Sequence, residues 1–268
     1  MIKIAIAQID TILGDVKRNI KKIEHYTDRA IEKNCNMVIF PELATSGYSL
    51  RDLVSDAAVD FDSPYFDYLK AKSSQIEILF GFAEKYKSHF FNSACFIKDS
   101  NIEVYRKIFL PDYGMFEEGR YFTSGSQLSS TSIYDTSFGK ARIMICEDAF
   151  HINSHCEAFN EQVDLIVIHS ASPFWCNHNM VKPDLWKHIC TTSAIMNSCY
   201  VAFANRVGFE DGIGFFGNSF VVNPAGEIIA EAELFKEEMI IAEIDKKEVQ
   251  RIRMITPISK NEEGVWID

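Results

Sequence analysis

The stretch of this chain that most constrains its fold is VDLIVIHSA, residues Val163–Ala171. It is almost continuously apolar, and a strand of this kind is covered on both faces by other parts of the protein. Helices that pack on the faces of a sheet provide such cover in α/β proteins. At 268 residues, 47% of them hydrophobic, the chain is long and apolar enough to build the sizeable core that this arrangement needs.

The N-terminal part predicts a crossover between two strands. Ile2, Ile4 and Ile6 alternate with other residues as in a strand, and Asp15 precedes a helical pattern that it can cap. The second strand is Met37–Phe40, which ends in Pro41-Glu42. We expect further strands at 76–83, 90–98, 102–109, 141–146, 199–208, 217–229 (a hairpin with its turn at 223–226) and 237–245, and helices at 184–197 and 246–253. Residues 51–72 have the pattern of a connection, and residues 255–268 predict no element.

Composition narrows the class of partner and the compartment. The net charge is −11 and the pI is near 5.2, which argues against nucleic acid or an anionic membrane as partner, because both attract clustered Lys and Arg. The N-terminal apolar run is short and interrupted by Lys3 and Gln8, so we expect neither a signal peptide nor a membrane span. Seven cysteines without regular spacing indicate reduced thiols in a cytoplasmic protein. No linker or repeat divides the sequence, so residues 1–268 are expected to form one domain.

Three polar residues stand at the ends of separate apolar runs. Cys146 ends the run in ARIMICEDAF and is followed by backbone N–H groups that can face a carbonyl oxygen, which suits a thiol nucleophile. Glu42 follows Met37–Phe40 in apolar surroundings that make a carboxylate a better base, and Lys107 lies in a run that draws its ammonium toward a partly dry site. Each residue also fits a structural role, since cysteine is common in cores, glutamate in surface ion pairs, and an edge-strand lysine can keep its charge in water.

The segments around these residues favour the catalytic interpretation. FPEL, YRKIFLPDYG and MICEDAF resemble the segments that carry the Glu-Lys-Cys triad in the nitrilase superfamily of carbon-nitrogen hydrolases, and ASPF, NRVG and GNSFVVNPAGEI match further segments in the same order. The resemblance covers essentially the whole chain. It implies a four-layer α-β-β-α sandwich with two mixed sheets, and a homodimer or higher homo-oligomer. The residue pattern alone predicts only an α/β fold with a mixed sheet.

The resemblance also implies a reaction. The Cys146 thiolate would attack the carbon of a small-molecule carboxamide, ammonia or an amine would leave, and water would hydrolyse the thioester. Glu42 would act as general base, while Lys107 and the N–H after Cys146 would hold the oxyanion. Lys107 and Glu42 together are expected to favour the thiolate. No cofactor is expected for this chemistry.

Within the superfamily, the sequence is most similar to the glutaminase domain of glutamine-dependent NAD synthetases, because LPDYGMFEEGRYF resembles the segment after their lysine. By that resemblance Glu118 supports the triad, with Glu117 as the competing choice, and Tyr113 and Ser172 bind substrate. On pattern alone these two equally fit a core tyrosine and a turn serine. Where those glutaminases usually place Lys or Arg to grip the α-carboxylate of the substrate, this chain has His178. Histidine cannot replace a bidentate Arg, so a carboxamide other than free glutamine is favoured.

Several alternatives stay open. The sequence has no glycine-rich phosphate loop, so it is not expected to make NAD by itself, but it could supply ammonia to a separate synthetase. Nitrile hydrolysis, carbamoyl-amide hydrolysis and acyl transfer use similar triads in the superfamily. A partner-binding subunit without activity of its own and a metal site are two further interpretations. The candidate metal ligands, whose spacing matches no common metal motif, are His151, His155 and Cys156, with Cys176, His178, His188 or Cys190.

Overall fold

The crossover predicted at the N-terminus is confirmed. Strands β1 (Ile2–Gln8) and β2 (Met37–Ile39) pair in parallel, and helix α1 (Val16–Glu32) connects them. Asp15 caps α1, because its side chain accepts a hydrogen bond from the backbone N–H of Arg18. This unit places the end of β2, and with it the loop that starts at residue 40, at one edge of the sheet.

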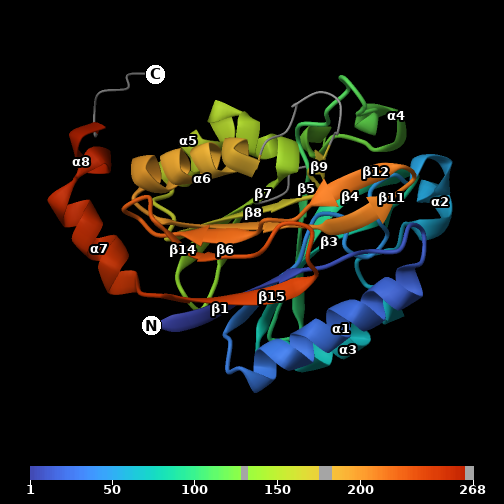
Figure 1. Ribbon diagram of the computed structural model, residues 1–268, viewed down its shortest axis with the longest axis horizontal. Helices are drawn as coiled ribbons and strands as arrows, with labels where there is room; N and C mark the ends of the chain where they lie inside the picture. Colours follow the sequence, from blue (N-terminus) through green and yellow to red (C-terminus); the bar gives the residue numbers. More distant parts are fainter. Residues whose placement is uncertain (128–131, 175–182, 263–268) are drawn as a thin grey trace.

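Two six-stranded mixed sheets face each other (Figure 1) in this computed structural model, which describes residues 1–127, 132–174 and 183–262. The first sheet has the order β15 (Glu238–Ile244), β1, β2, β3 (Glu77–Tyr86), β4 (His89–Lys98), β5 (Asn101–Arg106). The second has the order β14 (Ile228–Glu231), β13 (Phe220–Val222), β10 (Tyr200–Asn205), β8 (Leu165–Ser170), β7 (Lys140–Ile145), β6 (Ile133–Asp135). The mixed α/β architecture is therefore confirmed.

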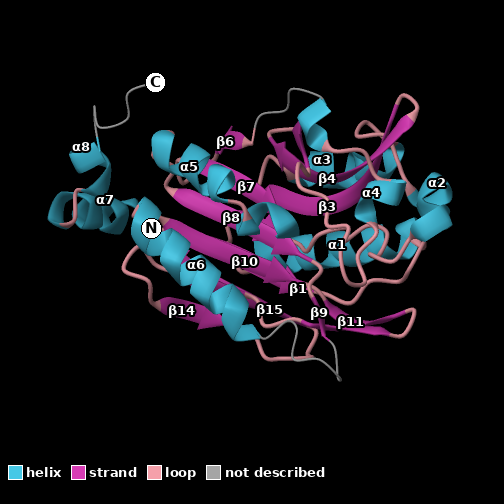
Figure 2. Ribbon diagram, turned by 90° about the horizontal axis from the view of Figure 1, so that it is seen from above, coloured by secondary structure: helices cyan, strands magenta, loops and turns pink. Residues whose placement is uncertain are grey.

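Helices cover the outer face of each sheet, which gives four layers. Helices α1 and α3 (Asp67–Lys72) lie below the first sheet in Figure 1, and α5 (Ile152–Asn160) and α6 (Pro183–Asn197) lie above the second. Seen from above, α5 and α6 lie across β7, β8 and β10 (Figure 2). The other helices are α2 (Val54–Ala57), α4 (Glu118–Tyr121), α7 (Lys246–Ile255) and α8 (Ile258–Glu262).

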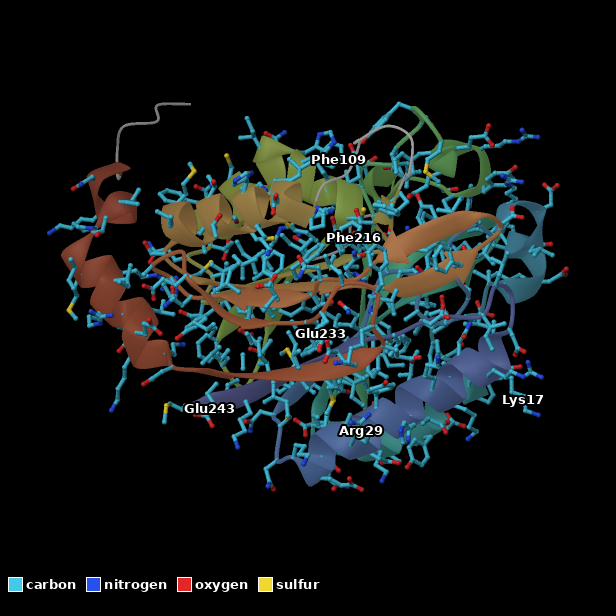
Figure 3. All side chains as sticks on the ribbon, in the orientation of Figure 1. Lys17, Arg29, Phe109, Phe216, Glu233 and Glu243 are labelled. Carbon is cyan, nitrogen blue, oxygen red and sulfur yellow. The ribbon has the colours of Figure 1, made fainter. Side chains whose placement is uncertain are left out.

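Alternating side chains explain why the layers stack in this way. On β1, Ala5 belongs to the same core cluster as Ile20 of α1, whereas its neighbour Ile4 belongs to the cluster that contains Ile143 of β7 in the second sheet. Met144, the neighbour of Ile143, faces the layer of α5 and α6. Each fully buried side chain of this size contributes roughly 1.5–3 kcal/mol. Side chains fill the space between the sheets, while Lys17 points outward from α1 (Figure 3).

Several details differ from the sequence-based expectation. The strand predicted to reach Phe109 ends at Arg106, because the backbone N–H groups of Ile108 and Phe109 bind the Asp148 side chain instead of a neighbouring strand. The predicted connection at 51–72 contains α2 and α3. A third sheet of three short strands was not predicted; it has the order β11 (Val207–Glu210), β12 (Ile213–Phe216), β9 (Pro173–Phe174). Across the described residues, the helices all fall short of the length and apolarity that crossing a bilayer requires.

Candidate active site

Glu42 lies in the loop after β2 and is completely buried. One carboxylate oxygen, Oε1, accepts hydrogen bonds from Nδ2 of Asn92 at 2.8 Å and Nζ of Lys107 at 2.7 Å. The other, Oε2, accepts from the backbone N–H of Ala171 at 2.8 Å. These donors come from β4 and from the segments after β5 and β8, so both large sheets fix the carboxylate in one orientation.

Lys107 follows β5, and its ammonium lies between two carboxylates. Nζ is 2.7 Å from Oε1 of Glu42 and 2.8 Å from Oε1 of Glu118, and all three side chains are buried. The hydroxyl of Tyr48 donates to the same oxygen of Glu118 at 2.6 Å. Burial by itself would lower the pKa of Lys107, but Glu118 and Glu42 outweigh burial and hold that pKa well above its ordinary value. The lysine is therefore a permanent cation.

Glu118 differs from its neighbour Glu117 in position and in electrostatics. Glu117 is exposed, whereas Glu118 contacts the Lys107 ammonium. Burial raises the pKa of Glu118 to about 7, against the effect of Lys107 and with the added effect of the nearby Glu42 charge. This carboxyl group can therefore change its charge near neutral pH.

Cys146 stands where β7 turns into the short helical segment Cys146–Phe150. Its backbone φ is +45°, an unusual value for a residue other than glycine, and such strain costs about 1–3 kcal/mol and is concentrated at functional sites. The hydroxyl of Ser170, at the end of β8, donates to Sγ of Cys146 at 3.2 Å. The nucleophile candidate is thus partly exposed and held by a neighbouring strand.

The electrostatics of Cys146 correct one expectation. Burial raises the pKa of its thiol well above the ordinary value, and the Glu42 charge raises it further, while Lys107 and the Ser170 hydroxyl act in the opposite direction. The thiol is therefore protonated in the resting site. Lys107 and Glu42 do not make a standing thiolate, so the proton must leave during the reaction.

Asp148 joins the cysteine turn to the lysine segment. Its Oδ1 accepts the backbone N–H groups of Ile108 and Phe109 at 3.2 and 3.0 Å, and its Oδ2 accepts the Tyr105 hydroxyl at 2.8 Å and the Ile145 N–H at 3.0 Å. The side chain is fully buried, so four donors depend on one carboxylate. These bonds fix residues 107 and 146 relative to each other.

The remaining predicted substrate-binding residues differ in their placement. Tyr113 is 53% exposed, and its hydroxyl donates to Glu147, the residue after Cys146, at 2.7 Å. Ser172 is buried, and its Oγ accepts the indole N–H of Trp186 at 2.7 Å. His178 lies outside the described residues.

A cavity of about 880 Å³ adjoins this cluster. Tyr48 and Glu118 line it, so it reaches the residues that hold the Lys107 ammonium. Other wall residues come from four parts of the chain: Ser49 and Arg51, residues 114–118 with 121–122, Phe209 with residues 211–214 around the turn between β11 and β12, and the separate rings of Phe174 and Phe235. A volume near the top of the range of roughly 300–1,000 Å³ that is usual for ligand sites gives room for a small-molecule substrate.

The histidines and cysteines of the alternative metal site have other contacts. The ring nitrogens of His155 lie 3.0 Å from Oγ of Ser193 and 2.8 Å from the carbonyl oxygen of Ala149. His151 stacks on Phe109 with ring centroids 3.5 Å apart. Within the described ranges, no three His, Cys, Asp or Glu side chains are grouped as a metal ion would need. Cys176 and His178 lie outside those ranges.

Sequence reasoning missed four residues that complete the cluster, namely Tyr48, Asn92, Asp148 and Ser170. The sequence could have indicated Asp148 and Ser170, because each is a polar residue at or just after the end of an apolar strand, as Cys146 and Glu42 are. Tyr48 and Asn92 carried none, since tyrosine in a loop and asparagine in a strand are common in many folds.

Comparisons with known proteins agree with this geometry. The family model for carbon-nitrogen hydrolases matches residues 3–254. The glutamine-dependent NAD(+) synthetase of Thermotoga maritima is 33% identical over 96% of this chain and 44% of its own length, and a protein of Schizosaccharomyces pombe named as a probable nitrilase is 31% identical over 93% and 91%. The solved glutamine-dependent NAD+ synthetase of Acinetobacter baumannii superposes with a TM-score of 0.83 at 30% identity, over 92% of this chain and 46% of that one. The chain thus spans about half the length of these synthetases.

Proposed function

Because the chain belongs to the carbon-nitrogen hydrolase family, we propose that it hydrolyses a small-molecule carboxamide to a carboxylate and ammonia, with Glu42, Lys107 and Cys146 as the catalytic triad. One observation carries the proposal: a buried ammonium is held between two carboxylates next to a strained cysteine at a strand end. Neither a salt bridge on the surface nor a core cysteine needs this arrangement. Perturbed groups of this kind gather at catalytic sites.

The resting charges define the order of the steps. Glu42 takes the thiol proton as Sγ of Cys146 attacks the amide carbon, and a tetrahedral intermediate forms. The permanent Lys107 cation and the backbone N–H of Glu147 stabilise its oxyanion. Glu42 then gives the proton to the leaving nitrogen, the C–N bond breaks, and ammonia departs. Water attacks the thioester while Glu42 takes its proton, and the carboxylic acid leaves as the thiol is restored.

Neighbouring groups support this cycle. The Ser170 hydroxyl stabilises negative charge on Sγ as it develops, because it already donates to that atom. Glu118 shares the ammonium of Lys107 with Glu42, so it helps to hold that cation in place beside the general base. Tyr113, whose hydroxyl donates to the residue after Cys146, and Ser172 are proposed as substrate contacts.

The test is ammonia release from a panel of glutamine, asparagine, ω-amides of dicarboxylic acids, carbamoyl amino acids and simple nitriles. We expect wild-type protein to release ammonia from at least one carboxamide and Cys146→Ala to release none. If the protein prefers a nitrile or a carbamoyl compound, the proposed activity changes from amidase to nitrilase or carbamoyl-amide hydrolase, both of which belong to the same superfamily. Equal release by both proteins would overturn the assignment of Cys146.

A second candidate role is the supply of ammonia to a separate synthetase. It is favoured by the likeness to about half of each NAD synthetase, since this chain matches 44% of the Thermotoga protein. In this role ammonia release would rise when the synthetase and its substrates are added. Activity that is independent of any synthetase would favour a free-standing amidase.

We also propose that residues 1–268 act as one cytoplasmic domain that forms a homodimer or higher homo-oligomer. The six cysteines of the described residues are free thiols. The outer layer formed by α5 and α6, with the end of the segment before α5, exposes large apolar side chains that a second copy would cover. They are Phe150, Ile152, Leu185, Ile195 and Met196. Light scattering should give at least a dimer for the wild type and a monomer for Met196→Glu, and a monomeric wild type would contradict the proposal.

A further inference from the structure

The cavity beside the triad has mostly apolar walls. Aromatic rings from separate segments line it, and they include Phe116, Tyr121, Phe174, Phe209 and Phe235. Such walls exclude water from a ligand and favour an apolar body. At about 880 Å³ the cavity extends well beyond what a carboxamide group needs, so the remote part of the substrate must decide its affinity.

Charges are sparse on this wall and unevenly placed. Among the described lining residues, Arg51 is the one Lys or Arg, while Glu117, Glu118 and Asp211 are acidic. Glu118 faces the Lys107 ammonium, and Arg51 lies on a different segment of the wall. The cavity wall therefore has an acidic part at Glu118, which contacts Lys107, and a cation on a different segment.

Arg51 is paired weakly enough to exchange its partner. Its Nη1 is 3.5 Å from Oδ2 of Asp211, and the two side chains are 63% and 50% exposed. Exposed pairs of this length are worth about 0–1 kcal/mol, so a substrate carboxylate that accepts two N–H bonds from the guanidinium can displace Asp211.

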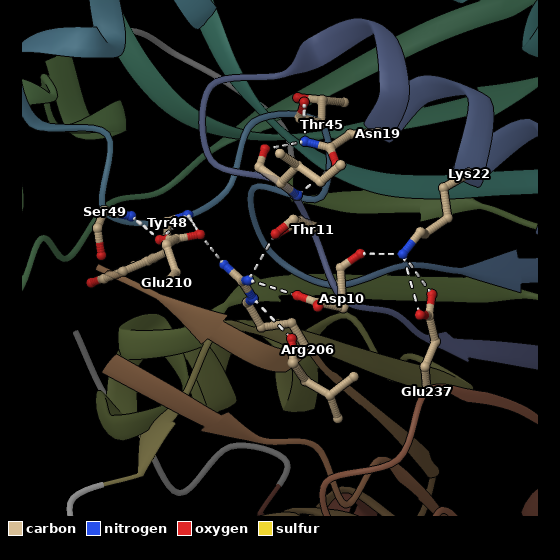
Figure 4. A network of polar contacts seen from close by, with 12 residues as sticks. Asp10, Thr11, Asn19, Lys22, Thr45, Tyr48, Ser49, Arg206, Glu210 and Glu237 are labelled. Atoms are coloured by element: carbon tan, nitrogen blue, oxygen red, sulfur yellow. Dashed lines mark hydrogen bonds and ion pairs between the residues drawn. The ribbon is translucent and has the colours of Figure 1, made fainter. Parts of the chain in front are cut away.

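The backbone that carries Arg51 is nevertheless held firmly (Figure 4). The buried carboxylate of Glu210 accepts the backbone N–H groups of Tyr48, at 2.9 Å, and of Ser49, and it pairs with the buried guanidinium of Arg206. The same segment presents the Tyr48 hydroxyl to Glu118. One network thus fixes the backbone at Tyr48 and Ser49, just before Arg51, relative to the Lys107 site, which lowers the cost of ordering a substrate between Arg51 and that site.

From this placement we propose that Arg51 forms a carboxylate subsite, and that the substrates are carboxamides that carry a carboxylate at the end remote from the amide, joined by an apolar body. The inference rests on the proposed function and specifies its substrate class. Asp211 is the partner that the substrate carboxylate displaces from the guanidinium.

The experiment compares matched pairs of amides in which a methyl group replaces the carboxylate: succinamate with butanamide, glutaramate with pentanamide, and adipamate with hexanamide. The quantity measured is the ratio of kcat/KM for the acid to kcat/KM for its neutral partner. We expect the wild type to favour the acid and Arg51→Gln to lower this ratio by about 10- to 100-fold, mainly through KM, as expected for a lost charge-assisted hydrogen bond. Arg51→Lys should restore part of the loss.

Two further variants separate a subsite from a structural ion pair. Asp211→Asn frees the guanidinium and should leave the ratio equal to or above that of the wild type, whereas a merely structural pair would make Arg51→Gln and Asp211→Asn behave alike. The exposed Arg251 of α7 is the matched control, and Arg251→Gln should leave the ratio unchanged. An unchanged ratio in Arg51→Gln, or parallel losses in Arg51→Gln and Asp211→Asn, would overturn the inference.

Binding without chemistry distinguishes failure of this inference from failure of the proposed function. In Cys146→Ala protein, calorimetric titration with glutarate should detect binding that Arg51→Gln weakens by at least tenfold. Ammonia release without any effect of Arg51 would refute the subsite alone. Glutarate binding that depends on Arg51, without ammonia release from any amide, would support the subsite and refute the proposed reaction.

Discussion

Replacing Asp148 by Asn tests how the nucleophile and the lysine are held in register. In the folded protein this one carboxylate accepts three backbone N–H groups and the Tyr105 hydroxyl, and none of its surface is exposed. An amide of the same shape has one acceptor oxygen, and its nitrogen is a donor. The substitution therefore changes hydrogen bonding while volume is conserved.

The magnitude follows from which donors lose their acceptor. If the amide nitrogen faces Tyr105 and Ile145, the hydroxyl can turn and accept, but the Ile145 N–H is left opposite a donor, which costs about 1–3 kcal/mol. The bonds from Ile108 and Phe109 then lose the charge of their acceptor, at a cost of roughly 0.5–1 kcal/mol each. If the amide nitrogen instead faces Ile108 and Phe109, two backbone N–H groups lie opposite a donor, so this orientation is less favourable. The free energy of unfolding should fall by about 2–5 kcal/mol.

The assay is urea denaturation at pH 7, with midpoint and slope compared between the wild type and Asp148→Asn. Asp99→Asn is the matched control, since Asp99 lies exposed in the turn between β4 and β5 and should change stability by less than about 0.5 kcal/mol. An Asp148→Asn protein whose unfolding free energy stays within about 1 kcal/mol of the wild type would refute the reasoning. It would mean that the four donors find other acceptors at little cost.

Three further predictions concern the charges of the site. In wild-type protein kcat/KM should fall as pH decreases through about 7, because protonation of Glu118 removes one of the two negative charges that hold the Lys107 ammonium in place. Glu118→Gln should lack this step, and a step that persists would contradict the assignment. Tyr48→Phe removes a donor that lowers the pKa of Glu118, so the step should move to higher pH, and a shift to lower pH would count against the contact. Ser170→Ala should raise the apparent pKa for alkylation of Cys146 by iodoacetamide and should slow this alkylation about tenfold at pH 7, because the hydroxyl donates to Sγ. Peptide mass spectrometry follows the alkylation, and superimposable pH profiles for the two proteins would rule out a role for the hydroxyl.

Much of the fold could be predicted because the spacing of apolar residues along the chain indicates which segments form strands and which form helices. The alternation around Ile4 predicted β1, the polar cap at Asp15 predicted the start of α1, and the turn before Gly226 predicted the hairpin of β13 and β14. The residues proposed as the triad could also be selected from the sequence, since each ends or follows an apolar run. The four-layer arrangement was not, because it depends on which sheet face meets which, and only the resemblance to a known family supplied it.

The parts that could not be predicted depend on contacts between distant segments. The strand that ends at Arg106 continues as an apolar pattern, and only the carboxylate of Asp148, far along the chain, explains why it stops there. Strand β9 has two residues, too few to show a period. The contact of Tyr48 with Glu118 and the protonated state of Cys146 arise from burial, and local sequence does not specify burial for a loop tyrosine or a strand-end thiol.

The central claim is that Cys146 carries the acyl group of a carboxamide during hydrolysis, and intact-protein mass spectrometry tests it most directly. Wild-type protein would be mixed with a turned-over amide, stopped in acid and weighed beside Cys146→Ala. We predict a species heavier than the free protein by the mass of the substrate minus ammonia, located at Cys146 by peptide mapping and missing in Cys146→Ala. Ammonia release by the wild type without this species at any stopping time, or the same adduct in Cys146→Ala, would contradict the account.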